Sequence, residues 1–219
     1  MAAAVIFDLD GTLVTFNLDI RDWRRTLLDL MKKRGFDTGG LDLATPTQQI
    51  LDFARAQAAS DGPGRFESLR SEAYSVLDSM ELEGVASSSV FPGAVDTLRR
   101  LKTKGVRLCV LTNSGRRAAT LSLKKEGLMT YFEFVLTRDD TGTMKPRPEG
   151  ISKAVSMLGV RPDQVCYVGD SPYDIAAAKG AGTKAVSVAT GNFTAERLRS
   201  EGADFVIATL GELPGVLGF

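Results

Sequence analysis

Short apolar runs alternate with segments of helical periodicity along most of the chain. The first run, Val5-Ile6-Phe7, contains β-branched and aromatic residues and favours a buried strand close to the N-terminus. From Pro92 onward the two patterns alternate regularly. The predicted strands span about residues 106–111, 132–137, 165–168, 185–188 and 204–207. The predicted helices span about residues 94–104, 116–126, 148–158, 172–179 and 194–200. This alternation is typical of a parallel sheet that is covered by helices on both faces.

Residues 19–84 differ, because their periodicity is helical throughout and predicts no strand. Asp19 is a candidate N-cap for a helix that continues to about Arg34, and Thr45-Pro46 has the form of an N-cap followed by proline. The third predicted helix spans about residues 65–82, and a linker follows at residues 84–91.

The predicted fold class is therefore α/β, a doubly wound, Rossmann-like parallel sheet with an inserted all-helical domain. The expected boundaries are residues 1–17 and 88–219 for the core and residues 18–87 for the helical insertion.

Charge and hydropathy exclude two classes of partner. The 27 basic residues equal the 27 acidic residues, so the chain has no net positive field to attract nucleic acid. Basic pairs such as Arg24-Arg25 fall in helical patterns and are interpreted as solvated faces. The sequence shows no long apolar segment or signal peptide, so we expect no membrane association and a cytoplasmic location.

The chain contains no histidine, which excludes Ser-His-Asp and Cys-His catalysis and histidine-ligated metals. Cys109 and Cys166 each lie within an apolar run, and we interpret them as small buried hydrophobic residues. Any catalysis must therefore depend on carboxylates, hydroxyls, lysine, arginine, the backbone and a hard cation.

Two carboxylates, Asp8 and Asp10, follow the first strand at the edge where open α/β sheets bind ligands. Because they are two residues apart, their side chains point to the same side if the backbone stays extended, and Gly11 permits a turn after them. Like charges held close are costly unless a cation or a proton intervenes, which favours a site. The alternative is that these aspartates only end a strand and cap a turn. A calcium loop is excluded, because its glycine would have to be the sixth residue rather than the fourth.

Polar groups also follow later strands or precede helices, at Thr112-Asn113-Ser114, at Lys145, and at Gly169 to Asp174. Each group has a structural alternative: a helix cap, a surface lysine and a capping box, respectively. Because all of them are expected at one edge of the sheet, together they favour a shared site.

These segments carry a family resemblance. Asp-Leu-Asp-Gly-Thr-Leu at residues 8–13, Leu-Thr-Asn at 111–113, Lys145 with Pro146, and Gly-Asp-Ser-x-x-Asp at 169–174 resemble the four motifs of the haloacid dehalogenase superfamily of aspartate-dependent phosphohydrolases. The resemblance covers the whole chain. The helical insertion corresponds to what this superfamily calls a type 1 cap, and the chain is similar in general to phosphoglycolate phosphatases.

The resemblance implies that Asp8 is a nucleophile that forms an aspartyl-phosphate. A carboxylate is already ionised at neutral pH, so it needs no activating base. Asp10 would give a proton to the leaving group and later take one from water. Thr112 and Lys145 would complete the catalytic set.

The same resemblance implies a Mg²⁺ site formed by the Asp8 carboxylate, the Asp10 backbone carbonyl and Asp170. Asp174 would lie behind these ligands, holding Lys145 or a metal-bound water. The backbone near Asn113 and at Gly11 would contact the phosphoryl group of the substrate.

The expected function is Mg²⁺-dependent hydrolysis of a small phosphorylated metabolite. The helical insertion would act as a lid, with the Asp42–Thr47 loop and Arg65 as candidate contacts to the substrate. Three alternatives stay open: a phosphotransferase of the sugar-phosphate mutase type, a pyrophosphatase, and a metabolite-binding protein without catalytic activity.

Overall fold

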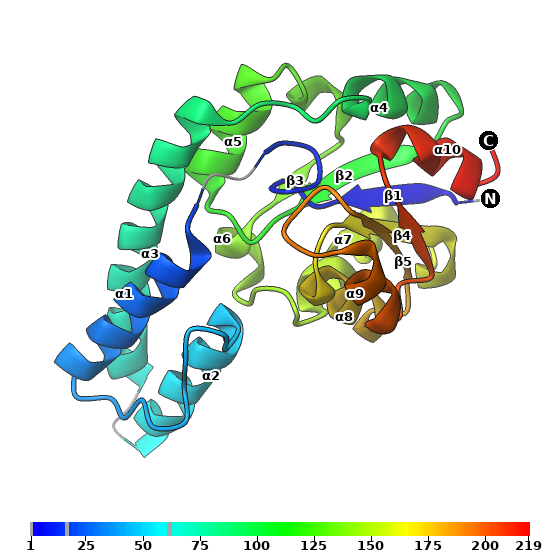
Figure 1. Cartoon of the computed structure of the whole chain (residues 1–219). Helices are drawn as coiled ribbons and strands as arrows, with labels where there is room; N and C mark the ends of the chain where they lie inside the picture. Colours follow the sequence, from blue (N-terminus) through cyan, green and yellow to red (C-terminus); the bar gives the residue numbers. More distant parts are fainter. Residues whose placement is uncertain (1, 16–17, 61–62) are drawn as a thin grey trace. The chain divides into compact units, whose positions relative to one another are not determined.

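The computed structural model of the 219-residue chain describes residues 2–15, 18–60 and 63–219. The chain divides into two compact units. One unit comprises Met1–Phe16 and Ser87–Phe219, and the other comprises Asn17–Ala86. The first is an α/β unit and the second is entirely helical in its described elements (Figure 1).

The α/β unit contains a six-stranded sheet in the order β3-β2-β1-β4-β5-β6, and all neighbouring strands are parallel. This arrangement confirms the predicted doubly wound fold class. The strand order reverses between β1 and β4, so the carboxyl ends of these two strands lie at the switch point where such sheets bind ligands. The strands are β1 (Ala4–Phe7), β2 (Arg107–Leu111), β3 (Val135–Leu136), β4 (Val165–Gly169), β5 (Lys184–Val188) and β6 (Phe205–Ile207).

Two hydrophobic cores lie on the two faces of the sheet, and β1 contributes alternately to both. Val5 and Phe7 belong to one core, while Ala4 and Ile6 belong to the other, as expected for side chains that alternate across a strand. All four are fully buried. The first core is closed by α4 (Ala94–Thr103), α5 (Arg116–Lys125) and α10 (Leu213–Val216) (Figure 1). The second is closed by α7 (Glu149–Leu158), α8 (Pro172–Gly180) and α9 (Ala195–Ser200).

The third strand is shorter than the sequence predicts. β3 comprises only two residues instead of residues 132–137, because Met129–Tyr131 forms a 3-10 helix for which Phe132 is the C-cap. A short helix that was not predicted, α6 (Arg138–Thr141), follows β3 and is opened by a capping box between Thr137 and Asp140.

In its described residues the helical unit contains three α-helices, α1 (Ile20–Lys33), α2 (Thr47–Gln57) and α3 (Pro63–Ser87). The Asp19 side chain accepts hydrogen bonds from the backbone of Arg21 and Asp22, which confirms the predicted N-cap. The predicted Thr45 cap is wrong: the Thr45 hydroxyl donates to Asp42 Oδ1 at 2.9 Å, and Pro46 occupies the cap position of α2. Helix α3 extends into the segment that was predicted to be a linker.

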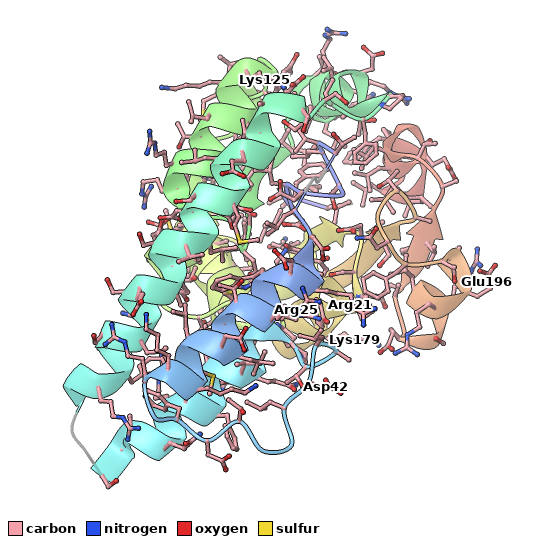
Figure 2. The ribbon with its side chains drawn as sticks, turned by 60° about the vertical axis from the view of Figure 1, so that its left-hand side comes forward. Arg21, Arg25, Asp42, Lys125, Lys179 and Glu196 are labelled. Atoms are coloured by element: carbon pink, nitrogen blue, oxygen red, sulfur yellow. The ribbon has the colours of Figure 1, made fainter. Side chains whose placement is uncertain are left out.

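The basic pair at Arg24-Arg25 is only partly a solvated face. Arg25 and Asp22 form an exposed ion pair on α1, and Figure 2 shows Arg21 and Arg25 on this helix. Arg24 is buried, and its Nη1 donates to the Leu43 carbonyl at 3.0 Å, which ties the loop before α2 to α1. The prediction was wrong for Arg24, because adjacent helical residues point in different directions.

Two further expectations concern the cysteines and the membrane. Cys109 and Cys166 are buried free thiols that belong to opposite cores, which confirms that they act as small hydrophobic residues.

Among the helices in residues 2–15, 18–60 and 63–219, none combines the length and the hydropathy that a bilayer span requires.

Candidate active site

The carboxyl end of β1 places Asp8 at the switch point and then folds back in a tight turn. The Asp8 backbone amide donates to the Val168 carbonyl at 2.8 Å, which continues the pairing with β4. The Leu9 carbonyl accepts from the backbone amides of Leu13 and Val14, and Gly11 adopts a φ of 80° that side chains disfavour. The Asp8 side chain is only 8% exposed, so its charge is removed from bulk water.

The ammonium group of Lys145 lies between two buried carboxylates. Nζ is 2.7 Å from Asp8 Oδ1 and 2.7 Å from Asp174 Oδ1, and only the contact with Asp174 has hydrogen-bond geometry. Burial alone would lower the pKa of Lys145, but the charges of Asp174 and Asp8 outweigh it and raise that pKa. Lys145 is therefore positively charged at neutral pH, beside the carboxylate that was predicted to be the nucleophile.

The Asp174 side chain is held by the backbone amide and the hydroxyl of Ser171, the residue that precedes α8. Its Oδ2 accepts from the Ser171 backbone amide at 3.0 Å and from the Ser171 hydroxyl at 2.6 Å, which completes a capping box. Its Oδ1 faces Lys145. The structural and functional interpretations of Asp174 are thus compatible, because each uses a different oxygen atom.

Three carboxylates could share a cation. One oxygen from each of Asp8, Asp170 and Asp174 lies within 4.8 Å of the other two. Burial, followed by the charge of Asp174, raises the pKa of Asp170 to about 7. Burial also raises the pKa of Asp8 well above its ordinary value, although Lys145 opposes this effect.

A hard divalent cation fits this group of side chains. Three carboxylates face one ammonium group, and the buried Asp8 Oδ1 receives no hydrogen bond of ordinary geometry from the described residues. Oxygen ligands of this kind suit Mg²⁺. Since Asp174 is already held by Lys145 and Ser171, Asp8 and Asp170 are the better candidates for direct ligands, together with the Asp10 carbonyl.

The raised pKa values predict how the metal-free protein responds to pH. A carboxyl whose pKa is raised by folding stabilises the fold below its unfolded value, about 3.9, and this contribution is lost as pH rises through the folded value. For Asp170 the loss is complete only above about pH 7. Exposed carboxyls such as Asp163, whose pKa is lowered by Arg161, are already ionised above pH 5. They therefore do not make stability depend on pH in this range.

We therefore expect the Tm of the chelator-treated protein to fall between pH 5.5 and pH 8. The fall should be about 4 °C or more, since 1 kcal/mol changes the Tm of a domain of this size by roughly 2–4 °C. Mg²⁺ should raise the Tm more at pH 8 than at pH 5.5, because protons compete with the metal. Calorimetry of the wild type and of Asp170→Asn measures this, and the variant should show a smaller pH effect and a smaller Mg²⁺ effect, because Asp8 still contributes to both. If the Tm of the wild type changes with neither pH nor Mg²⁺, the assignment of Asp170 as a buried metal ligand is refuted.

Asp10 lies beside the end of β2. Its Oδ2 accepts from the Ser114 hydroxyl at 2.5 Å and, more weakly, from the Thr112 hydroxyl at 3.4 Å. Burial raises the pKa of Asp10, while the Ser114 hydrogen bond and the charges of Lys145 and Arg138 oppose the increase. A carboxyl with a raised pKa is suited to carry a proton near neutral pH.

Asn113 connects two segments of the site through its side chain. Its Oδ1 accepts from the Lys145 backbone amide at 2.8 Å, and its Nδ2 donates to the Lys145 carbonyl at 3.2 Å. The Asn113 carbonyl accepts from Nη1 of the buried Arg138 at 3.0 Å. The side chain of Asn113 thus fixes the position of Lys145, whereas the prediction concerned the Asn113 backbone as a phosphate contact.

The structure brings all the predicted site residues to one edge of the sheet, at the ends of β1, β2 and β4 and before α7. It adds two residues that the sequence did not suggest, Thr190 and Gly191, and it gives Ser114, expected only as part of a polar run, a hydrogen bond to Asp10. The Thr190 hydroxyl, after β5, donates to the Gly11 carbonyl at 2.7 Å. A position at the carboxyl end of β5 was a signal available from the strand order, but Thr190-Gly191 carries no charge that would have drawn attention to it.

Gly191 leaves room for the Asp170 carboxylate. A Cβ at residue 191 would overlap Oδ2 of Asp170, and a Cβ at Gly11 would come within 2.6 Å of the same atom. Two glycines on separate loops therefore enclose this carboxylate without side chains of their own.

Gly191→Ala is expected to displace Asp170 and weaken Mg²⁺ binding at least tenfold, in the range found when groups that orient metal ligands are altered. Titration calorimetry with Mg²⁺ on the wild type and the variant tests this. Gly215→Ala is a matched control, because a Cβ there meets no atom within 4 Å. Equal Mg²⁺ affinity for Gly191→Ala and wild type would show that Asp170 does not need this space.

The two candidate lid contacts are engaged within the helical unit. Arg65 donates to the Gly35 carbonyl at 2.7 Å, and its guanidinium lies 4.2 Å from the centre of the Phe36 ring. Asp42, labelled in Figure 2, accepts hydrogen bonds from the Thr45 hydroxyl and from the backbone amides of Ala44 and Thr45, and these bonds lower its pKa. These contacts support structural roles for both residues.

Comparisons with known proteins agree on one family. A family model described as haloacid dehalogenase-like hydrolase matches residues 2–182. The chain is 35% identical over 230 residues to a phosphoglycolate phosphatase of Rhodospirillum rubrum, covering 100% of this chain and 92% of that protein. It is 30% identical over 219 residues to the pyrophosphatase PpaX of Anoxybacillus flavithermus, covering 98% and 96%. The fold is similar to a HAD family hydrolase from Deinococcus radiodurans solved with bound phosphate and sodium, with a TM-score of 0.64, 25% identity and coverage of 99% and 95%.

Proposed function

Because the chain belongs to the haloacid dehalogenase-like hydrolase family, we propose that it is a Mg²⁺-dependent phosphatase that hydrolyses a small phosphorylated metabolite through an aspartyl-phosphate. The observation that carries this proposal is the Lys145 ammonium group held 2.7 Å from both Asp8 and Asp174. It places a fixed positive charge where a phosphate dianion would approach a carboxylate nucleophile.

In the first step an Asp8 carboxylate oxygen attacks phosphorus, and the bond from phosphorus to the leaving oxygen breaks. Asp10 gives its proton to that oxygen, so an alcohol departs and Asp10 becomes ionised. Lys145 and the Thr112 hydroxyl stabilise the charge on the transferring group. When bound at Asp8, the Asp10 carbonyl and Asp170, Mg²⁺ would offset the repulsion between carboxylate and phosphate.

In the second step water attacks the phosphorus of the aspartyl-phosphate. Asp10, now a carboxylate, takes a proton from this water, and the bond between phosphorus and Asp8 breaks. Inorganic phosphate leaves, and both aspartates return to their starting states. A chain without histidine can complete this cycle because one carboxyl serves as acid and then as base.

The helical unit, residues 17–86, is proposed to be the cap that selects the leaving group and limits the access of water. A pyrophosphatase is the second candidate, favoured by the similarity to PpaX over nearly the whole chain. The same two steps would apply, with inorganic phosphate instead of an alcohol as the group that departs.

The test is to measure phosphate release by the wild type from p-nitrophenyl phosphate, phosphoglycolate and pyrophosphate, with Mg²⁺ and with chelator. Metal-dependent release from the esters supports the phosphatase, and preferential cleavage of pyrophosphate supports the second candidate. Transfer of phosphate to an added sugar phosphate instead of water would indicate a mutase. Absence of turnover on all substrates with Mg²⁺ would contradict the proposal.

A further inference from the structure

Among the described residues, the two hydroxyls that hydrogen-bond the Asp10 side chain both contact the same oxygen atom, Oδ2. Ser114 Oγ donates to Asp10 Oδ2 at 2.5 Å, and Thr112 Oγ1 lies 3.4 Å from the same atom. The first distance is well within the range of a hydrogen bond between a hydroxyl and a carboxyl group, and the second is close to the upper limit of that range. Ser114 therefore provides the main hydrogen bond that orients this carboxyl group.

Ser114 is itself fixed before α5 begins at Arg116. The residue is buried, its backbone amide donates to Thr112 Oγ1 at 3.0 Å, and its carbonyl accepts from the Arg138 amide at 3.4 Å. A hydroxyl anchored at both ends of its residue loses little conformational freedom when it binds a partner. The position of Asp10 is thus set by the end of β2 as well as by its own turn.

A hydroxyl that donates to Oδ2 disfavours a proton on that oxygen. While the hydroxyls of Ser114 and Thr112 donate to Oδ2, a proton on Asp10 is directed to Oδ1. In the proposed first step this proton moves from Oδ1 to the leaving oxygen, while the bond from Asp8 to phosphorus forms and the bond to the leaving oxygen breaks. In the second step Oδ1 accepts the proton from water.

We propose that Ser114 is a positioning residue that orients Asp10 so that Oδ1 delivers its proton to the leaving group. The inference rests on the proposed function and adds a residue outside the four motifs. It predicts a specific dependence on the leaving group, because a strongly basic leaving oxygen needs the proton and a weakly basic one does not.

The experiment compares phenyl phosphate with 2,4-dinitrophenyl phosphate, which share a ring but differ greatly in leaving-group basicity. The ratio kcat/KM is used because it covers only the steps up to departure of the phenol. With Mg²⁺ present, Ser114→Ala should lower kcat/KM for phenyl phosphate by about 10–100-fold, a part of the typical contribution of a general acid. For the dinitrophenyl ester the same variant should lower kcat/KM by less than about threefold.

Three variants make the comparison specific. Ser114→Thr keeps the hydroxyl and should restore most of the activity on phenyl phosphate. Ser114→Cys, a weaker donor of similar volume, should give an intermediate ratio and replaces Ser114→Ala if that variant does not fold. Ser122→Ala is the matched control, because Ser122 is a buried serine of α5 whose hydroxyl has no hydrogen-bond partner among the described residues.

Equal losses on the two esters, or no loss on either, would overturn the role of Ser114 while leaving the phosphatase intact. If the wild type hydrolyses neither ester with Mg²⁺, or if Asp8→Asn keeps the activity of the wild type, the proposed function is overturned and this inference with it. The two failures are therefore distinguishable within one set of measurements.

Discussion

Asp8→Asn is expected to abolish phosphate-ester hydrolysis while leaving the protein at least as stable as the wild type. The loss in kcat/KM should be roughly 10⁴-fold or more, as found when a catalytic nucleophile is removed. The amide has the shape of the carboxylate but cannot form the aspartyl-phosphate. The loss of activity should therefore be chemical and not a consequence of unfolding.

The stability of this variant follows from the charges around residue 8. Burial and the neighbouring charges of Asp174 and Asp170 raise the pKa of Asp8, so its ionised form destabilises the metal-free protein. A neutral amide removes that cost, and Lys145 keeps Asp174 as its hydrogen-bonded partner. We expect the Tm of Asp8→Asn, measured at pH 8 with chelator, to equal or exceed that of the wild type.

Turnover of p-nitrophenyl phosphate, thermal unfolding, and mass spectrometry of acid-quenched enzyme for a phosphorylated aspartate provide the three measurements. Asp96→Asn is the matched control, because Asp96 forms an exposed ion pair with Arg99 in the same unit. Asp8→Ala guards against recovery of aspartate by deamidation. Activity within tenfold of the wild type in both residue 8 variants would show that another group is the nucleophile.

The elements that bear these charges were predictable because strands and helices follow local periodicity. The run Val5-Ile6-Phe7 is buried on both faces, so its apolar character alone identifies a strand of a parallel sheet. Once the strand order is known, the polar residues after β1, β2 and β4 must lie at one edge. That logic placed Asp8, Asp10, Thr112 and Asp170 together without any knowledge of their contacts.

The contacts themselves depended on distances that no local pattern encodes. Asn113 clamps the backbone of Lys145 from 32 positions away, and Thr190 bonds the Gly11 carbonyl from 179 positions away. The sequence pattern around Ser114 is typical of a helix cap, although the Ser114 hydroxyl donates to Asp10. A polar residue near a strand end has several possible partners, and only the folded chain determines which of them is close.

The same limit applies to Arg138. Its position in a short polar run, Thr137-Arg138-Asp139-Asp140, gave no indication that the side chain would be almost completely buried. The capping box between Thr137 and Asp140 opens α6 and turns Arg138 inward, where it bonds the Asn113 carbonyl. A buried cation in this position supports the end of β2, and its charge opposes the rise in the pKa of Asp10 that burial causes, an effect that only proximity could reveal.

Replacing Lys145 by methionine is expected to affect both activity and stability. Methionine keeps much of the length and apolar stem of the side chain but removes the charge 2.7 Å from Asp8 and Asp174. Removing one member of a buried ion pair costs about 3–5 kcal/mol, because the remaining charge is left uncompensated. We also expect kcat/KM to fall by roughly 10²–10³-fold, as for other groups that stabilise charge in the transition state.

The destabilisation should depend on pH in a defined direction. Without the ammonium group, Asp8 loses a charge that favours its ionised form, so its pKa should rise further. A carboxyl with a raised folded pKa contributes stability below its unfolded value and loses it as pH increases. The difference in Tm between wild type and Lys145→Met, measured with chelator, should therefore be larger at pH 8 than at pH 5.5.

Lys153→Met is a matched control, because Lys153 is an exposed lysine of α7 whose ammonium donates to the Asp140 carbonyl. It should change the Tm little at either pH. Mg²⁺ should restore part of the stability of Lys145→Met at pH 8, since a cation at Asp8 and Asp170 replaces some of the missing positive charge. If Lys145→Met instead keeps wild-type stability at pH 8 with chelator, the carboxylates cannot be as desolvated as their burial implies, and the electrostatic basis of the proposed site fails.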